Sequence, residues 1–216
     1  MTGKERFLAW AAGKPVDQKP TLDWPRANSQ ADGKIFPAGV VAEGLDPNCP
    51  TATFALIPNL YREFQGAGTE PIALLKDATA EKLVDERVAT NQRIARQAID
   101  NGAIGVFYEI HGADASQCTP MEYGGLFLER DRAFLDSISD APCNFIYING
   151  KEPYLDFVSD LPATVFAWDA KGSGIPVSEV RKMRSGLLAA DDPDADIQIS
   201  ADGSITEFLE GVLAHA

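Results

Sequence analysis

The chain has 216 residues, of which 45% are hydrophobic, and its formal net charge is −13. The length suits one domain, and we expect the range 1–216 to form it. The negative charge argues against nucleic-acid binding, and no apolar stretch approaches the roughly 20 residues of a membrane helix. The apolar stretch at 7–12 is too short for a signal peptide, so we expect a cytoplasmic protein. The cysteines lack C-x-x-C spacing, which indicates neither a disulfide framework nor a zinc knuckle.

The N-terminal quarter of the chain contains short elements separated by breakers. Residues 3–13 are expected to form a helix that ends before two prolines, and 21–24 to form a short strand. The range 26–50 is rich in Gly, Pro, Asn and Asp, which indicates mainly loop with an irregular strand at 35–42. The range 51–58 alternates and predicts a further strand.

From residue 79 onward, helices and strands alternate. The clearest helix is 79–101, where apolar residues recur at helical spacing, and strand 103–110 follows it directly. The same order then repeats, with helices at 119–139, 152–160, 176–184 and 204–214, and strands at 144–150, 164–169 and 186–190. This alternation predicts an α/β fold with a parallel sheet. The acidic run 191–196 lacks metal-loop spacing and is expected to be a solvated loop.

Polar residues gather where the predicted strands end, which is where ligands bind in parallel α/β domains. Glu109 and His111 share one face of their strand because strand side chains alternate, and Tyr147 and Asn149 share the same face of the next. The opposite positions on both strands are largely apolar and suit the side that faces the helices. Other strand-end candidates are Asp23, Arg26, Asp169 and Asp191.

Several segments, in this order, resemble the uroporphyrinogen decarboxylase superfamily. They are K-E-R-F-L-A-W-A-A-G-K-P at the start, A-I-D-N-G-A-I-G-V-F-Y, P-M-E-Y-G-G-L-F-L-E-R-D, F-I-Y-I-N-G and V-F-A-W-D. The resemblance covers the first 25 residues and most of 79–190. It implies a (β/α)8 barrel of the triosephosphate isomerase (TIM) type.

The chain is much shorter than typical members of this superfamily, so we expect a contracted or incomplete barrel, with the contraction at 26–50. An incomplete barrel would leave unpaired strand edges and an uncovered core. We therefore expect association, most simply as a homodimer.

The departures from the superfamily pattern bear on chemistry. Decarboxylases of this superfamily grip propionates with several arginines, and here Arg26 alone follows the first strand, where it is suited to clamp one carboxylate. The methyltransferase branch holds zinc through a His-x-Cys pair, and here Tyr147 and Asn149 occupy those positions. Neither is a zinc ligand, so we expect no metal and no cofactor.

Three functions are consistent with this pattern. The first is a metal-independent carboxy-lyase acting on a carboxylated small molecule or a tetrapyrrole. The second is a corrinoid-linked methyltransferase that works without zinc, and the third is a non-catalytic barrel with a binding or assembly role. For the lyase, the catalytic candidates are His111, Glu109, Tyr147 and Asp169, and the substrate-binding candidates are Arg26, Asp23, Asn149 and Tyr123 of the helix at 119–139.

Overall fold

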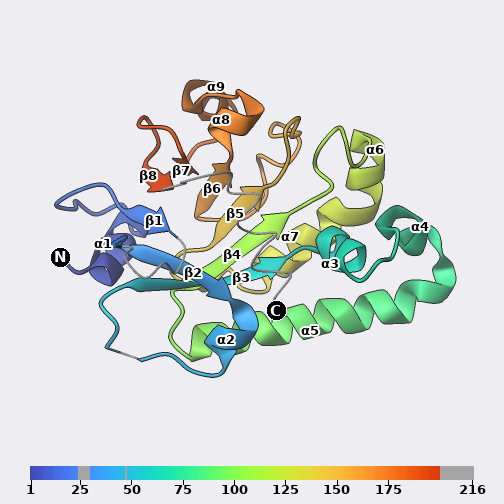
Figure 1. Ribbon diagram of the computed structural model, residues 1–216, viewed down its shortest axis with the longest axis horizontal. Helices are drawn as coiled ribbons and strands as arrows, with labels where there is room; N and C mark the ends of the chain where they lie inside the picture. The colour runs from blue at the N-terminus through green and yellow to red at the C-terminus, as the bar shows by residue number, and fades with distance from the viewer. Residues whose placement is uncertain (24–29, 47, 200–216) are drawn as a thin grey trace.

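The computed structural model describes residues 1–23, 30–46 and 48–199, and its centre is a closed barrel of parallel strands (Figure 1). Each strand pairs with its neighbours in chain order, and the last pairs with the first. The strands are β1 (Thr21–Asp23), β2 (Gly33–Pro37), β3 (Ala52–Pro58), β4 (Gly105–Ile110), β5 (Phe145–Ile148), β6 (Val165–Trp168), β7 (Leu187–Ala190) and β8 (Ile197–Ile199). The expected (β/α)8 barrel is confirmed.

Closure of the barrel decides between the two forms expected from the chain length. Thr21 of β1 lies opposite Gln198 of β8, so the sheet has no open edge between its first and last strands. The barrel is contracted in its elements rather than incomplete, since the stretch between 30 and 46 holds only β2 and the short helix α2 (Ala38–Ala42). The open edges that motivated the homodimer are absent from the described barrel, and the dimer stays a prediction.

The helices vary widely in length. The longest is α5 (Glu81–Asp100), which runs along one side of the molecule, while the short α8 and α9 lie on the opposite side near β6 and β7 (Figure 1). The remaining elements are α1 (Gly3–Ala11), α3 (Leu60–Gly66), α4 (Pro71–Lys76), a 3-10 turn (Ala78–Ala80), α6 (Pro120–Tyr123), a π-helical turn (Gly124–Leu128), α7 (Glu129–Asp136), α8 (Ala170–Ser173) and α9 (Val177–Met183).

Alternation along the strands divides the core into two layers. The inward-facing layer fills the barrel with residues such as Phe54, Phe107, Phe145 and Val165. The outward-facing layer packs strand residues such as Tyr108 against the surrounding helices. The predicted faces of the strands at 103–110 and 144–150 are therefore correct, since Val106, Tyr108, Ile110, Ile146 and Ile148 all belong to the layer beneath the helices.

The N-terminal end of the barrel is covered by α1. Phe7 is fully buried, and its ring lies 5.2 Å from that of Phe54 and 6.3 Å from that of Phe145, centroid to centroid. Gly33 on β2 permits this packing, because a β-carbon there would lie 2.7 Å from the Phe7 ring. The N-terminal helix thus closes one end of the barrel and leaves the other end for a site.

Some elements differ from their predictions. The range 35–42 is a strand only to Pro37 and then turns into α2, and residues 152–160 form turns instead of a helix. The helix at 119–139 is interrupted by the π-helical turn. Four elements have no counterpart among the predictions, namely α3, α4, α8 and β8. The helix expected at 204–214 lies outside the described residues.

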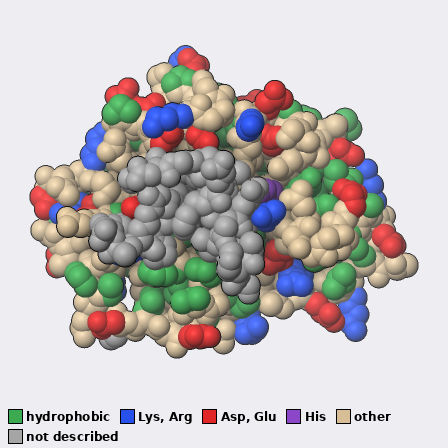
Figure 2. All heavy atoms as spheres, in the orientation of Figure 1, with side chains coloured by type: hydrophobic (Ala, Val, Ile, Leu, Met, Phe, Trp, Pro, Cys, Tyr) green, Lys and Arg blue, Asp and Glu red, His purple; other side chains and the backbone are tan. Residues whose placement is uncertain are grey.

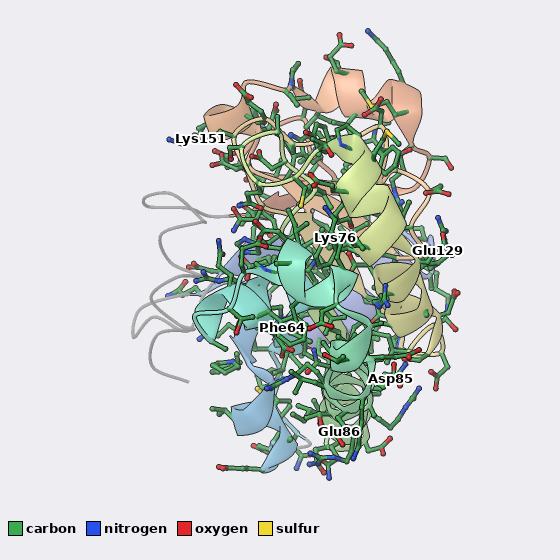
Figure 3. All side chains as sticks on the ribbon, turned by 90° about the vertical axis from the view of Figure 1, so that its right-hand side faces the viewer. Phe64, Lys76, Asp85, Glu86, Glu129 and Lys151 are labelled. Atoms are coloured by element: carbon green, nitrogen blue, oxygen red, sulfur yellow. The ribbon has the colours of Figure 1, made fainter. Side chains whose placement is uncertain are left out.

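The surface is charged and mixed. On the face in Figure 2, acidic and basic side chains are interspersed over the described part of the chain. Figure 3 shows the side formed by α3, α4, α5 and α7, where Asp85, Glu86 and Glu129 are exposed and Phe64 is buried. No helix in the described ranges is long and apolar enough to cross a membrane.

Candidate active site

Glu109, His111 and Asn149 come together at the carboxyl ends of β4 and β5. Glu109 is the fifth residue of β4 and lies opposite Tyr147 in the sheet, and the main-chain N–H of Asn149 donates to the carbonyl of Ile110 at 2.9 Å. The pairing of the two strands therefore continues past their formal ends. It fixes the positions from which the three side chains meet.

The contacts within this group are short. His111 Nε2 lies 2.9 Å from Glu109 Oε1, and Asn149 Nδ2 donates to the same oxygen at 2.7 Å. Asn149 Nδ2 also lies 3.2 Å from His111 Nε2. All three residues are buried, with at most 3% of their surface exposed. A buried carboxylate that accepts two hydrogen bonds orients the imidazole beside it.

This geometry assigns the tautomer of His111. A carboxylate oxygen only accepts, so Nε2 carries the hydrogen that it donates to Glu109, and Nδ1 of the neutral ring is then an acceptor. Among the described residues, neither His111 Nδ1 nor Glu109 Oε2 has a hydrogen-bond partner, although both atoms are buried. Buried polar atoms are rarely left in this state, and such atoms at the carboxyl end of a barrel indicate a place for a ligand.

Tyr147 lies on β5 opposite Glu109, one member of this group. Its side chain is fully buried and stacks on Phe107, with ring centroids 5.6 Å apart. Its strand position opposite both Glu109 and Ala167 places it in the inward-facing layer. Tyr147 therefore shares the inward-facing layer at the level of Glu109, and its role at a site stays a prediction.

Asp169 and Asp191 are engaged with α8. Asp169 Oδ1 accepts from the N–H of Gly172 at 2.7 Å and caps this helix. Asp191 Oδ1 accepts from the N–H of Lys171 at 3.3 Å, and its Oδ2 lies 3.2 Å from Lys171 Nζ. These carboxylates lie at strand ends as predicted, but their described contacts are to α8 and not to His111.

The predicted substrate-binding residues fall in different places. Asp23 ends β1 and is buried, while Arg26 lies outside the described residues. Tyr123, at the end of α6, lies behind the sheet in the layer beneath the helices, where its hydroxyl donates to Asp131 Oδ2 at 2.7 Å. Its described hydroxyl contact is thus to a buried carboxylate on α7.

A buried polar network behind the sheet was missed by sequence reasoning. Asp131 accepts from Tyr108 at 2.7 Å, from Tyr123 at 2.7 Å and from Asn59 Nδ2 at 3.3 Å. Asn59 in turn bonds the main chain of His111. The sequence carried a weak signal for Asn59 alone, since an Asn after a strand and before Leu-Tyr-Arg-Glu suits a helix N-cap.

The π-helical turn explains how Tyr123 and Asp131 meet. The two residues are eight apart, and in an uninterrupted α-helix they would be rotated by about 80° from one another. A π-helical turn holds about one extra residue, so the same eight residues complete close to two whole turns. The turn at Gly124–Leu128 therefore brings both side chains onto one face.

Burial shifts the pKa values in this network. The pKa of Asp131 rises from 3.8 to about 6 because burial disfavours its charge, although the three hydrogen bonds that it accepts lower it. The pKa values of Tyr108 and Tyr123 rise well above 10, first through burial and then through the nearby carboxylate. The tyrosines therefore stay protonated and serve as donors.

The thiols do not form a metal centre. Cys118 and Cys143 are free and buried, and burial raises their pKa values to about 11 and about 12. Within residues 1–23, 30–46 and 48–199, no three His, Cys, Asp or Glu side chains gather closely enough to hold a metal ion. The donors at the described site are a carboxylate, an imidazole and an amide.

Comparison with known proteins supports the fold. No family model matches the sequence, and no curated protein matches it. Among solved structures, a methyltransferase from Methanosarcina mazei is similar, with a TM-score of 0.71 and 13% sequence identity. The match covers 99% of this chain and 98% of that one. At this identity the similarity shows a common barrel fold, and membership of the uroporphyrinogen decarboxylase superfamily stays a prediction.

Proposed function

We propose that the chain is a metal-independent enzyme of the lyase type, in which His111 exchanges a proton with a carbon atom of a carboxylated small molecule. The observation that carries this proposal is the buried pair of His111 and Glu109, whose ring nitrogen and carboxylate oxygen lie 2.9 Å apart. A histidine oriented by a carboxylate is a common general acid and base. The second nitrogen of His111 makes no hydrogen bond to a described residue and is available to a substrate.

Decarboxylation fits these groups. The bond between the carboxylate and its carbon breaks, carbon dioxide leaves, and the electron pair stays on the carbon. Nδ1–H of the protonated His111 then delivers its proton to that carbon, and the neutral ring is reprotonated from water. Glu109 stabilises the imidazolium before transfer by accepting from Nε2.

The remaining predicted residues take supporting roles in this proposal. Asn149 orients Glu109, and Tyr147 lies in the inward-facing layer close to the developing charge. Arg26 is proposed to hold a second carboxylate of the substrate, and Asp23 to contact it at the end of β1. Asp169 and Tyr123 contribute through α8 and through the network around Asp131. The substrate class, a small carboxylic acid or a tetrapyrrole, rests on the resemblance described above.

The proposal is tested by turnover in heavy water. The purified protein is incubated with a panel of small carboxylic acids and a polycarboxylated tetrapyrrole, and carbon dioxide release and deuterium at the product carbon are measured. His111→Gln should lower the rate by about 10²-fold to 10⁴-fold, the usual contribution of a general acid. Its melting temperature should change little, and a variant that keeps full turnover would contradict the role of His111.

Methyl transfer without zinc is the second candidate, because the similar solved structure is described as a methyltransferase. In that case a corrinoid partner would dock at the same end of the barrel. When a free methylated corrinoid is added to the protein, the visible absorbance of the corrinoid should then change as the methyl group leaves.

A third outcome, in which a retained ligand binds equally to wild type and His111→Gln without turnover, would favour a binding or assembly role. Native mass spectrometry of the purified protein would report such a ligand together with the predicted homodimer.

A further inference from the structure

We propose that Asn59 and Asp131 are positioning residues that hold His111 in the orientation needed for proton transfer. This inference deepens the function proposed above and rests on His111 as its reacting group. The hydrogen bonds of Asn59 to His111 go to its main chain, and Asp131 bonds Asn59, so both would act through the main chain of His111.

Asn59 holds the main chain of His111 from both sides. Its Nδ2 donates to the carbonyl of His111 at 2.9 Å, and its Oδ1 accepts from the N–H of His111 at 3.2 Å. The N–H of Asn59 also donates to the carbonyl of Glu109 at 2.8 Å. The side chain thus continues the pairing of β3 with β4 past the last residue of β3. This places His111 at a defined point where a strand would otherwise fray.

Asp131 fixes Asn59 in turn. Its Oδ2 accepts from Asn59 Nδ2 at 3.3 Å and from the Tyr123 hydroxyl at 2.7 Å, while its Oδ1 accepts from the Tyr108 hydroxyl at 2.7 Å. Asn59 is fully buried and Asp131 is 1% exposed. An acceptor that satisfies three buried donors selects the amide orientation in which Nδ2 faces it, and Oδ1 is then left to accept from His111.

The residue after His111 is Gly112, whose φ of 87° lies in the left-handed region. A β-carbon on Gly112 would lie 2.9 Å from the ring of Tyr61. The N–H of Gly112 donates to Gln117 Oε1 at 2.6 Å. The main chain after His111 is therefore also fixed. Hydrogen bonds thus hold the backbone at His111 and at the residue that follows it.

The same network gives His111 a dependence on the protonation of Asp131. The groups that face Asp131 are Tyr108 from β4, Tyr123 from α6 and Asn59 from the end of β3, with Arg130 nearby on its own helix. Each of the three hydrogen bonds from these groups requires an Asp131 oxygen as its acceptor, so a protonated carboxyl cannot keep all three without rearrangement. The raised pKa of Asp131, about 6, puts this change in an accessible pH range.

The test uses the scarcity of histidine in the chain. The sequence contains two histidines, so His215→Gln leaves His111 as the sole imidazole. Two-bond nitrogen–proton spectra of the labelled protein then report the tautomer and protonation of His111 without any ligand. In this parent, Nε2 should carry the hydrogen at pH 8, and Nδ1 should show the shift of an unprotonated nitrogen.

Asn59→Ala should allow both tautomers and reduce the shift difference between the two ring nitrogens by half or more. When the backbone amide chemical shift of His111 is followed against pH, the parent should show an inflection near pH 6, and Asp131→Asn should remove it. If Asn59→Ala does not fold, Asn59→Asp keeps the shape and the acceptor for the His111 N–H but loses the donated hydrogen bonds. It is expected to show the same loss of a single tautomer.

Asn144→Ala is the matched control. Asn144 is equally buried, and it also bonds the main chain of β4, with its Oδ1 accepting from Val106 at 3.0 Å and its Nδ2 donating to Ile138 at 2.8 Å. It lies at the other end of the strand, so its removal should lower the melting temperature without changing the His111 spectrum. An unchanged tautomer in the Asn59 variants, or the same change in Asn144→Ala, would overturn the proposal.

These outcomes are separable from the proposed function. If no carboxylic acid is turned over but the tautomer depends on Asn59, the lyase assignment fails and the positioning role stands. If His111→Gln is inactive but the tautomer of His111 does not change in the Asn59 and Asp131 variants, the positioning role is contradicted and the proposed function stands. With a substrate in hand, Asn59→Ala should lower kcat by about 10-fold to 100-fold with little change in KM, since a misplaced reacting group costs that much.

Discussion

The two ends of the barrel both bury charged side chains, but they differ in how completely those charges are satisfied. At the N-terminal end, Arg6 donates to Asp17 at 2.7 and 2.9 Å, to the carbonyl of Met1 at 3.0 Å and to Asp32. Asp32 also accepts from the N–H and hydroxyl of Thr21 at 3.0 and 3.1 Å. At the C-terminal end, Glu109 Oε2 and His111 Nδ1 find no partner among the described residues.

This difference separates stability from chemistry within one fold. Hydrogen bonds that satisfy every buried charge stabilise the folded state, whereas an unsatisfied buried atom costs free energy unless a ligand completes it. In barrels of this kind, the carboxyl end carries function and the opposite end carries stability. We therefore expect substitutions at the two ends to have different effects.

Removal of Arg6 should have the largest effect on stability. Arg6→Ala leaves Asp32 buried without its guanidinium, and breaking a buried ion pair from one side costs about 3 kcal/mol or more. Urea unfolding followed by circular dichroism would measure this loss. As a control, Arg96→Ala breaks the exposed pair with Asp140 and should cost far less. Equal losses in the two variants would show that the N-terminal network is not special.

The pH dependence of stability should have opposite signs for the network around Asp131 and for the Arg6 network at the N-terminal end. The pKa of Asp131 is raised to about 6, so the folded state binds a proton between pH 4 and 6 that the unfolded state releases. Stability is then full below about pH 4 and falls by about 3 kcal/mol as the pH rises through 6. Glu63, whose pKa burial raises to about 7, acts in the same direction. The Arg6 guanidinium lowers the pKa of Asp17, which favours stability above pH 4 and loses it in acid.

Melting temperatures from pH 3 to pH 8 would test these signs. Asp131→Asn should flatten the decline between pH 4 and pH 7, and Asp17→Asn should flatten the loss in acid. If Asp131→Asn keeps the wild-type slope in the upper range, Asp131 is not the group that titrates.

Tyr108→Phe should have an intermediate effect. It removes one of the three hydrogen bonds to the Asp131 carboxylate, a loss of about 2 kcal/mol at pH 8 for a bond to a charged group. The pKa of Asp131 should rise further, because that hydrogen bond lowers it. Denaturation at pH 8 and pH 5 should reveal a smaller loss at the lower pH, and an equal loss would show that Asp131 does not change its charge between these two pH values.

The smallest effect should follow Glu109→Gln. Its lost charge-assisted hydrogen bonds are partly offset by removal of a buried charge with one unsatisfied oxygen, so we expect a change below about 1 kcal/mol. The matched substitution at the other end is Asp32→Asn, where both oxygens have partners, and it should cost clearly more. A Glu109→Gln variant that unfolds as readily as Asp32→Asn would remove the contrast between the ends.

Much of the barrel was predictable because its strands are buried apolar runs. The strands at 51–58, 103–110, 144–150 and 164–169 follow this rule, and their alternation placed Glu109, His111 and Asn149 together. Strand β8 has three residues and follows an acidic loop, so it lacks the apolar run that would predict a strand. Its pairing with β1 comes from closure, which the whole barrel decides.

The network behind the site could not be predicted for a different reason. Asp131 lies in the charged sequence E-R-D-R, which is typical of an exposed helix, yet it is 1% exposed. Tyr108 was expected to face the helices, and it does, but its hydroxyl partner comes from a helix more than twenty residues away. A buried carboxylate becomes visible only when the structure brings its donors around it.

The π-helical turn at Gly124–Leu128 also has a consequence for how this sequence can change. Deletion of one codon there would restore a regular α-helix, in which Tyr123 and Asp131 would be seven residues apart and rotated by only about 20° from one another. The two side chains would thus keep their common face, and the carboxylate linked to His111 would keep Tyr123 as a donor. Conversely, insertion of one residue into a regular helix that already carried this contact is a simple evolutionary origin for the turn itself.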